Sequence, residues 1–149
     1  MDLSRHFTLE ELVASETAAR RGIDNTPSAE IVENLKVLCL TLEEVKDVAE
    51  GKAVLISSGY RCPKLNSAVG GSRNSAHMEG LAADCTSPKF GSVKQFCEAI
   101  RDSDIQFDQL IFEFDSWAHI SINLSGQNRR QVITARKVNG KTEYSDGIV

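Results

Sequence analysis

Apolar positions at helical spacing dominate the first third of the chain. Thr8 and Glu11 match the S/T-x-x-E pattern, in which each side chain bonds the other residue's backbone N–H. One helix is therefore predicted over residues 7–21. A second helix is predicted from the cap Asn25-Thr26-Pro27 to about Gly51, because its apolar residues recur at intervals of three and four: Ile31, Leu35, Leu38, Leu42, Val45 and Ala49.

Beyond residue 52 the pattern changes to short apolar runs separated by polar turns. Such runs are typical of strands, and they predict strands at residues 53–56, 81–85, 109–114, 118–123 and 130–137. Residues 92–101 are predicted to form a third helix, residues 62–75 an irregular loop, and the polar tail after residue 139 an edge or loop. Because no repeat or linker divides the chain, we predict a single α+β domain over residues 1–149. Its small antiparallel sheet would be packed by the N-terminal and middle helices.

Composition and charge exclude several classes of protein. Hydrophobic residues make up 41% of the chain and charged residues 26%, which is ordinary for a folded domain. The 17 Lys and Arg against 21 Asp and Glu give a net charge of −4, which argues against a general nucleic-acid binder. No run reaches the roughly 18 apolar residues of a membrane helix. We therefore expect a monomer with neither nucleic acid nor a membrane as its partner.

Two further features bear on location and redox state. The first six residues lack the charged-then-apolar layout of a secretion signal, so we expect the protein to be cytoplasmic on synthesis. The four cysteines are scattered along the chain without a C-x-x-C pair. We therefore expect reduced and mostly buried thiols.

Two of the three histidines occur in contexts typical of metal ligands. His77 and Asp84 are separated by seven positions, and Gly80 between them allows a turn that brings both side chains towards one point. His119 lies on a predicted strand. Two imidazoles and one carboxylate suit Zn²⁺ with an open position for water, which is the pattern of a catalytic site.

These residues belong to a longer, ordered set of motifs that extends to about Ser121. The motifs are Phe7-Thr8-Leu9-Glu10-Glu11-Leu12, Asn25-Thr26-Pro27, Ser58-Gly59-Tyr60-Arg61, Leu65-Asn66, Val69-Gly70-Gly71, Ser75-x-His77-x-x-Gly80-x-Ala82-x-Asp84 and Trp117-x-His119. In this order they resemble the M15 zinc peptidases. The resemblance is closest to the D-alanyl-D-alanine carboxypeptidase-like branch that is common in phage genomes.

The resemblance implies roles for particular residues. It implies that His77, Asp84 and His119 hold Zn²⁺, and that Arg61 faces the substrate and stabilises charge on the scissile carbonyl. An arginine suits that role because its guanidinium binds an oxyanion or carboxylate with a directed fork. We also expect Ser75 and Trp117 to contact the substrate, which the resemblance places among the stem peptides or cross-links of bacterial peptidoglycan.

The general base is the point at which the chain departs from the family pattern. Several branches have an acidic residue three positions before the last histidine, and here that position is Ser116. The neighbouring candidates are Glu113 and Asp115. A three-residue hairpin loop over residues 115–117 would put Glu113 on the face of His119, whereas a two-residue turn at residues 115–116 would put it on the opposite face. We favour Glu113 over Asp115.

Two classes of function follow from these residues. The first is a zinc peptidase of peptidoglycan, either a D-Ala-D-Ala carboxypeptidase or an endolysin-type endopeptidase, which acts on the cell wall after phage-type release. The second is a zinc-stabilised, catalytically inactive wall-binding module. This alternative remains because Ser116 stands where several branches of the family have an acidic residue.

Overall fold

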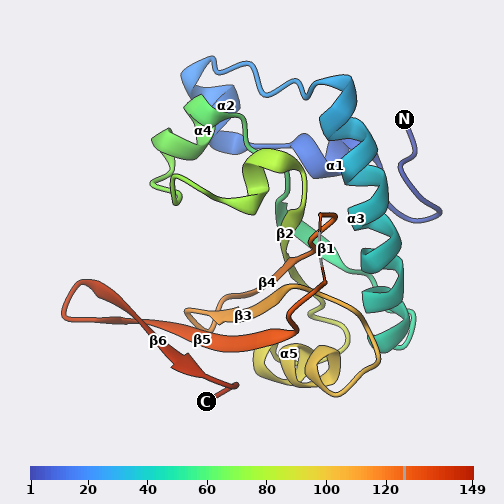
Figure 1. Ribbon diagram of the computed structural model, residues 1–149, viewed down its shortest axis with the longest axis vertical. Coiled ribbons are helices and arrows are strands. Elements are labelled where there is room, and N and C mark those ends of the chain that lie inside the picture. The colour runs from blue at the N-terminus through green and yellow to red at the C-terminus, as the bar shows by residue number, and fades with distance from the viewer. Residues whose placement is uncertain (126) are drawn as a thin grey trace.

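The computed structural model describes residues 1–125 and 127–149, and its elements lie around one sheet (Figure 1). The helices are α1 (Leu9–Val13), α2 (Glu16–Arg21), α3 (Ala29–Val48), α4 (Pro63–Ala68), the 3₁₀ turn η1 (Ala76–Glu79) and α5 (Val93–Arg101). The strands are β1 (Leu55–Ser58), β2 (Ala82–Thr86), β3 (Gln109–Glu113), β4 (Trp117–Ser121), β5 (Gln131–Val138) and β6 (Lys141–Asp146). The predicted α+β class is confirmed.

The sheet is mixed, so the prediction of an antiparallel sheet is wrong in one pairing. Its strand order is β1-β2-β4-β3-β5-β6, and β5 runs parallel to β3. The reason is that β2 already occupies the other edge of β4. The chain that leaves β4 must therefore pass to the open edge of β3, and it reaches that edge at the end where β3 begins.

The helices differ from the predictions at their ends. The predicted helix over residues 7–21 is two helices, because Ala14 is extended and the Ser15 side chain caps α2. The long helix starts at Ala29 with Ser28 as its cap, so the motif at residues 25–27 lies outside it. The predicted loop over residues 62–75 contains α4, which begins at Pro63.

The main core lies between the sheet and helices α3 and α5. The buried face of α3 is the one that the apolar spacing predicts. The four cysteines are free; three are buried and Cys62 is half-buried. Within the described part of the chain, no helix combines the length and apolar character that crossing a membrane requires. The largest core side chains include Leu35, Leu38, Leu42, Phe96, Ile100, Phe107, Leu110, Phe112 and Ile120.

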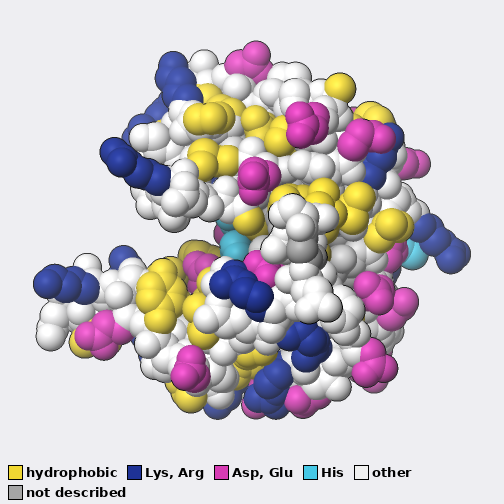
Figure 2. Space-filling view, in the orientation of Figure 1, with side chains coloured by type: hydrophobic (Ala, Val, Ile, Leu, Met, Phe, Trp, Pro, Cys, Tyr) yellow, Lys and Arg dark blue, Asp and Glu magenta, His cyan; other side chains and the backbone are white. Residues whose placement is uncertain are grey.

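Two parts of the molecule face each other across an open hollow. In the view of Figure 1, α2 and α4 lie above the hollow, and the β5–β6 hairpin projects below it, away from the rest of the sheet. Figure 2 shows a histidine side chain at the bottom of this hollow. The fold therefore places imidazole chemistry where solvent reaches the inside of the molecule.

Candidate metal centre

Three potential ligand side chains converge from three elements. Asp84 on β2 and His119 on β4 are a cross-strand pair, so their side chains share one face of the sheet. His77 comes from η1, which turns into β2 at Gly80 with φ of 72°. A side chain at Gly80 would crowd Ile31 at 3.0 Å, so both the backbone angle and the packing require glycine.

The ligand cluster, defined here as His77, Asp84 and His119, is compact and buried. His77 Nε2 lies 3.3 Å and His119 Nδ1 lies 3.0 Å from the same oxygen, Asp84 Oδ1. One ligand atom from each residue lies within 4.8 Å of the other two. Burial by itself raises the pKa of Asp84, but the interactions with His119 and His77 outweigh it and hold that pKa well below its ordinary value.

The orientation of His77 shows that a cation fits the ligand cluster. Its Nδ1 lies 2.7 Å from the carbonyl oxygen of Gly59, and a carbonyl only accepts, so Nδ1 carries the hydrogen. In a neutral imidazole Nε2 then holds a lone pair, which faces the carboxylate of Asp84. Two acceptors at this distance repel unless a positive charge lies between them. A histidine fixed through its other nitrogen is the usual arrangement at a metal.

Arg61 lies next to the ligand cluster, on a short segment between β1 and α4. Its backbone N–H donates to the carbonyl of His77 at 3.0 Å. Its side chain is half-buried, and Nε has no hydrogen-bond partner among the described residues. Burial lowers the pKa of Arg61, while the charges of Asp84 and Glu113 oppose that shift. The guanidinium is therefore placed to bind an anionic group.

Asn25 holds the arginine segment, defined as residues 59–62, from both sides of Arg61. Its Nδ2 donates to the carbonyls of Val13 at 2.9 Å and Tyr60 at 3.0 Å, and its Oδ1 accepts from the N–H of Cys62 at 2.8 Å. The sequence assigned Asn25 to a helix cap, and its role as a clamp was missed. The only signal was its place in a motif shared with the family.

The same segment packs tightly against α1. The N–H of Tyr60 donates to the carbonyl of Leu12 at 2.7 Å. A Cβ at Gly59 would come within 2.3 Å of that carbonyl oxygen, so only glycine allows the approach. Since Gly59 also accepts the hydrogen bond from His77, α1 and Asn25 together set the position of one ligand and of Arg61.

Glu113 reaches the ligand cluster through a hairpin that differs from both predicted loops. The loop is residues 114–116, so Glu113 pairs with Trp117. Phe114 and Asp115 take left-handed backbone angles, which start the turn one residue earlier than expected. Glu113 still shares the face of His119, and its Oε1 lies 3.8 Å from His119 Nδ1. Burial raises the pKa of Glu113, and the charge of Asp84 adds to that rise.

Asp115 is not brought to the ligand cluster. Its exposed carboxylate forms an ion pair with Arg136 at 2.8 Å. The Arg136 guanidinium lies 5.6 Å from the centre of the Phe112 ring, and Phe112 belongs to the core on the opposite face of the sheet. Of the two acidic candidates, only Glu113 therefore faces the ligands.

The other predicted site residues have local roles in the structure. The Ser75 hydroxyl accepts from the N–H of His77 at 3.2 Å and so caps η1. Trp117 lies beside Glu113 and packs edge-on against Phe114 at 5.8 Å between ring centres. Its buried Nε1 has no hydrogen-bond partner among the described residues. Ser116 donates to the carbonyl of Phe114 within the turn at 2.9 Å.

Comparison with known families identifies one match. The family model described as Peptidase M15 matches residues 5–121. The matched range contains the ligand cluster, the arginine segment and Glu113, and it ends before β5. No curated protein matches the chain.

Proposed function

The chain belongs to the peptidase M15 family, a family of metallopeptidases, and we propose that it is a zinc-dependent peptidase of bacterial peptidoglycan. The observation that carries this proposal is the convergence of His77 Nε2, His119 Nδ1 and Asp84 Oδ1. Two nitrogens and one carboxylate oxygen are the donors of many catalytic zinc sites. When bound, zinc supplies a Lewis acid that polarises the scissile carbonyl and makes a water molecule more acidic.

The chain's own residues supply the proton transfer and the charge stabilisation. Glu113 accepts a proton from the attacking water and passes it to the nitrogen of the leaving amine as the C–N bond breaks. Burial raises the pKa of Glu113, which makes its carboxylate a stronger base for the first of these two transfers. Arg61 binds the oxyanion or a substrate carboxylate, since its buried Nε still has a hydrogen to donate.

The substrate class follows from the resemblance to D-alanyl-D-alanine carboxypeptidase-like proteins of phages. A carboxypeptidase removes the terminal D-alanine of a stem peptide, whereas an endopeptidase opens a cross-link. Both reactions use the same donors and the same base. We take the acting form to be a monomer that reaches the wall after phage-type release, without nucleic acid or a membrane as partner.

Digestion of purified peptidoglycan tests the proposal. Wild-type protein supplied with zinc should release fragments that mass spectrometry assigns to one bond: free D-alanine for a carboxypeptidase, or monomers from cross-linked dimers for an endopeptidase. Glu113→Gln should lower kcat about 10²- to 10⁴-fold while zinc content stays unchanged. Asp115→Asn is the matched control, two residues from Glu113, and should keep most of the activity because its partner is Arg136.

The outcome also distinguishes an inactive wall-binding module. Ser116 favours that function, because its hydroxyl belongs to the turn and cannot act as a base. If wild-type protein sediments with cell walls but releases no fragment from any wall type, the wall-binding module is the correct function and the peptidase is not. Equal losses of kcat in Glu113→Gln and Asp115→Asn would instead contradict the assignment of Glu113 as the general base.

A further inference from the structure

The β5–β6 hairpin lies outside the range that the family model matches. It consists of residues 131–146, whereas the match ends at residue 121. In Figure 1 the hairpin projects from the sheet beneath the hollow, on the far side from α4. The features of residues 5–121 therefore do not explain it.

Strand register places one face of the hairpin level with the catalytic carboxylate. Glu113 on β3 pairs with Ala135 on β5, and Ala135 pairs with Tyr144 on β6. Paired residues share a face, so Glu113, Ala135 and Tyr144 form a row across the sheet. Two strand spacings separate Glu113 from Tyr144, or about 10 Å.

Side-chain contacts make this face continuous from the ligand cluster to the hairpin. Trp117 packs on Phe114, which in turn packs on Ile111, Ile133 and Ala135. The Lys137 ammonium lies 5.5 Å from the centre of the Phe114 ring and donates to the Thr142 hydroxyl at 3.0 Å. Lys137 is therefore held on the face that carries Glu113.

This face offers a cation and an aromatic ring to solvent. Both contacts of Lys137 are with uncharged groups, the Phe114 ring and the Thr142 hydroxyl. Two carboxylates of these strands lie on the same face: Glu113 pairs with Ala135, two residues from Lys137, and Asp146 pairs with Ile133, four residues or about 13 Å along β5. Among the described residues neither forms an ion pair with Lys137. Tyr144 is 65% exposed, so its ring is open to solvent on this face.

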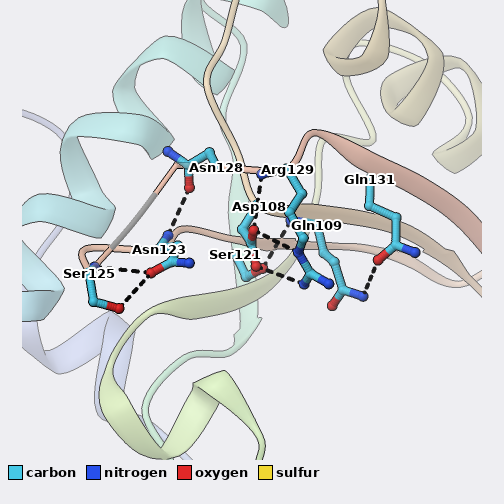
Figure 3. A network of polar contacts seen from close by, with 8 residues as sticks. All are labelled: Asp108, Gln109, Ser121, Asn123, Ser125, Asn128, Arg129 and Gln131. Carbon is cyan, nitrogen blue, oxygen red and sulfur yellow. Dashed lines mark hydrogen bonds and ion pairs between the residues drawn. The ribbon is translucent and has the colours of Figure 1, made fainter.

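The hairpin is anchored where it leaves the sheet. Figure 3 shows the network at the start of β5, where Arg129 forms a two-pronged ion pair with Asp108, and Gln131 accepts from Gln109 at 2.8 Å. On the opposite face, Arg136 bonds both Asp115 and the carbonyl of Val149. These contacts fix the register of β5 against β3, and with it the position of Lys137.

We propose that the β5–β6 hairpin is a substrate subsite for an acidic peptide, in which Lys137 binds a free carboxylate and Tyr144 supports the peptide backbone. This inference rests on the proposed function. Lys137 stands one strand over and two residues along from Glu113, or about 8 Å away. An extended peptide advances about 3.3 Å per residue, so the carboxylate belongs about two to three residues from the scissile bond. Stem peptides of peptidoglycan carry free carboxylates at that separation, and a terminal dipeptide does not reach the hairpin.

Three synthetic peptides test the subsite. The first is a stem pentapeptide that ends in D-Ala-D-Ala and has a free carboxylate on its second residue. In the second peptide that carboxylate is amidated, and the third is a capped D-Ala-D-Ala dipeptide. Lys137→Ala should raise KM about fivefold for the free-acid pentapeptide, as expected for loss of one exposed ion pair, and leave kcat and the other two substrates unchanged. Tyr144→Ala should raise KM for both pentapeptides and not for the dipeptide.

Lys141→Ala is the matched control. It removes the same charge from the same hairpin, but Lys141 pairs with Val138 on the opposite face, so KM should not change. The subsite would be overturned if Lys137→Ala and Lys141→Ala raised KM equally. It would also be overturned if Lys137→Ala raised KM for the dipeptide as much as for the free-acid pentapeptide. If wild-type protein cleaves none of the peptides, the carboxypeptidase form of the proposed function fails, the digestion of cross-linked peptidoglycan decides the endopeptidase form, and calorimetry still decides the subsite. The subsite is supported if the wild type binds the free-acid pentapeptide more tightly than the amidated one and Lys137→Ala abolishes that difference. Equal affinity of the wild type for both pentapeptides, or no binding, overturns it.

Discussion

The ligand cluster and the β5–β6 hairpin lie on the same face of one sheet but are built differently. In the cluster, each residue is at least nine-tenths buried and is held by a partner, as His77 is by the carbonyl of Gly59. On the hairpin, Lys137 and Tyr144 are exposed, and only the backbone register and a few anchors set their positions.

This difference separates two tasks within one hollow. Side chains that bind a metal must hold their atoms within a few tenths of an ångström, which requires burial and supporting hydrogen bonds. Side chains that sort substrates need only present a charge and a ring at the right distance. Changes at the cluster should therefore abolish function, whereas changes on the hairpin should alter KM for some substrates and not for others.

Removal of metal should have the largest effect on the protein. Zinc at about a thousand times its Kd adds about 4 kcal/mol to the free energy of unfolding. A chelator should therefore lower the Tm of the wild type strongly, while His77→Ala should start at the lower Tm and not respond. His6→Ala is the control, because His6 is exposed and paired with Glu43. A wild-type Tm that ignores the chelator, or stoichiometric zinc in His77→Ala, would contradict the cluster as a metal site.

Loss of the Asn25 clamp should have the next largest effect. Asn25→Ala leaves the carbonyl of Tyr60 and the N–H of Cys62 without their partner, which costs about 2 kcal/mol in urea unfolding. Because Arg61 lies between these two residues, kcat/KM should fall more than zinc content does. Asn25→Asp keeps the acceptor for Cys62 but sets a carboxylate oxygen against the carbonyls of Val13 and Tyr60, so its loss of stability should be at least as large as that of Asn25→Ala.

The control for the clamp is another asparagine with a weaker attachment. Asn34 makes one exposed hydrogen bond, to the carbonyl of Glu79 at 2.9 Å. Asn34→Ala should change the free energy of unfolding by well under half as much as Asn25→Ala. Equal losses in the two variants would show that Asn25 does no more than an ordinary surface amide.

The ligand cluster could be anticipated from the sequence because short local features carry it. Gly80 marks the turn after His77, and apolar runs mark the strands that hold Asp84 and His119. The apolar face of α3 could be anticipated for the same reason, since its period is visible over five turns. The convergence of His77, Asp84 and His119 and the buried face of α3 are therefore the two predictions of this kind that the structure confirms.

Features that depend on distant partners were not predicted from the sequence. The turn at residues 114–116 uses left-handed angles at Phe114 and Asp115 with no glycine to mark it, so the register of Glu113 was open. Parallel pairing of β5 follows from the occupation of β4 by β2, which no local pattern encodes. Asn25 lies two residues before Pro27, in a pattern typical of a helix start, but Ser28 is the cap and the Asn25 amide instead bonds Tyr60 and Cys62.

The smallest change in stability is expected from loss of the Asp108–Arg129 ion pair, which anchors the hairpin. The guanidinium of Arg129 holds the pKa of Asp108 below its ordinary value. A carboxyl group with a lowered pKa stabilises the fold above its unfolded pKa, near 4, and loses that contribution as the pH falls. Asp108→Asn should therefore cost about 1 kcal/mol or less at pH 7, and the difference from the wild type should shrink between pH 5 and pH 3.

Asp102→Asn provides the comparison for this anchor, because Asp102 pairs with its exposed neighbour Arg101 and should show a smaller loss of stability. Asp108→Asn also tests the hairpin. If the Arg129 pair serves to fix β5 against β3, the variant should raise KM for the free-acid pentapeptide and leave cleavage of the capped dipeptide unchanged. An equal loss on both substrates would mean that Asp108 supports the whole sheet, because a disturbance that reaches Glu113 and His119 cannot distinguish long substrates from short ones.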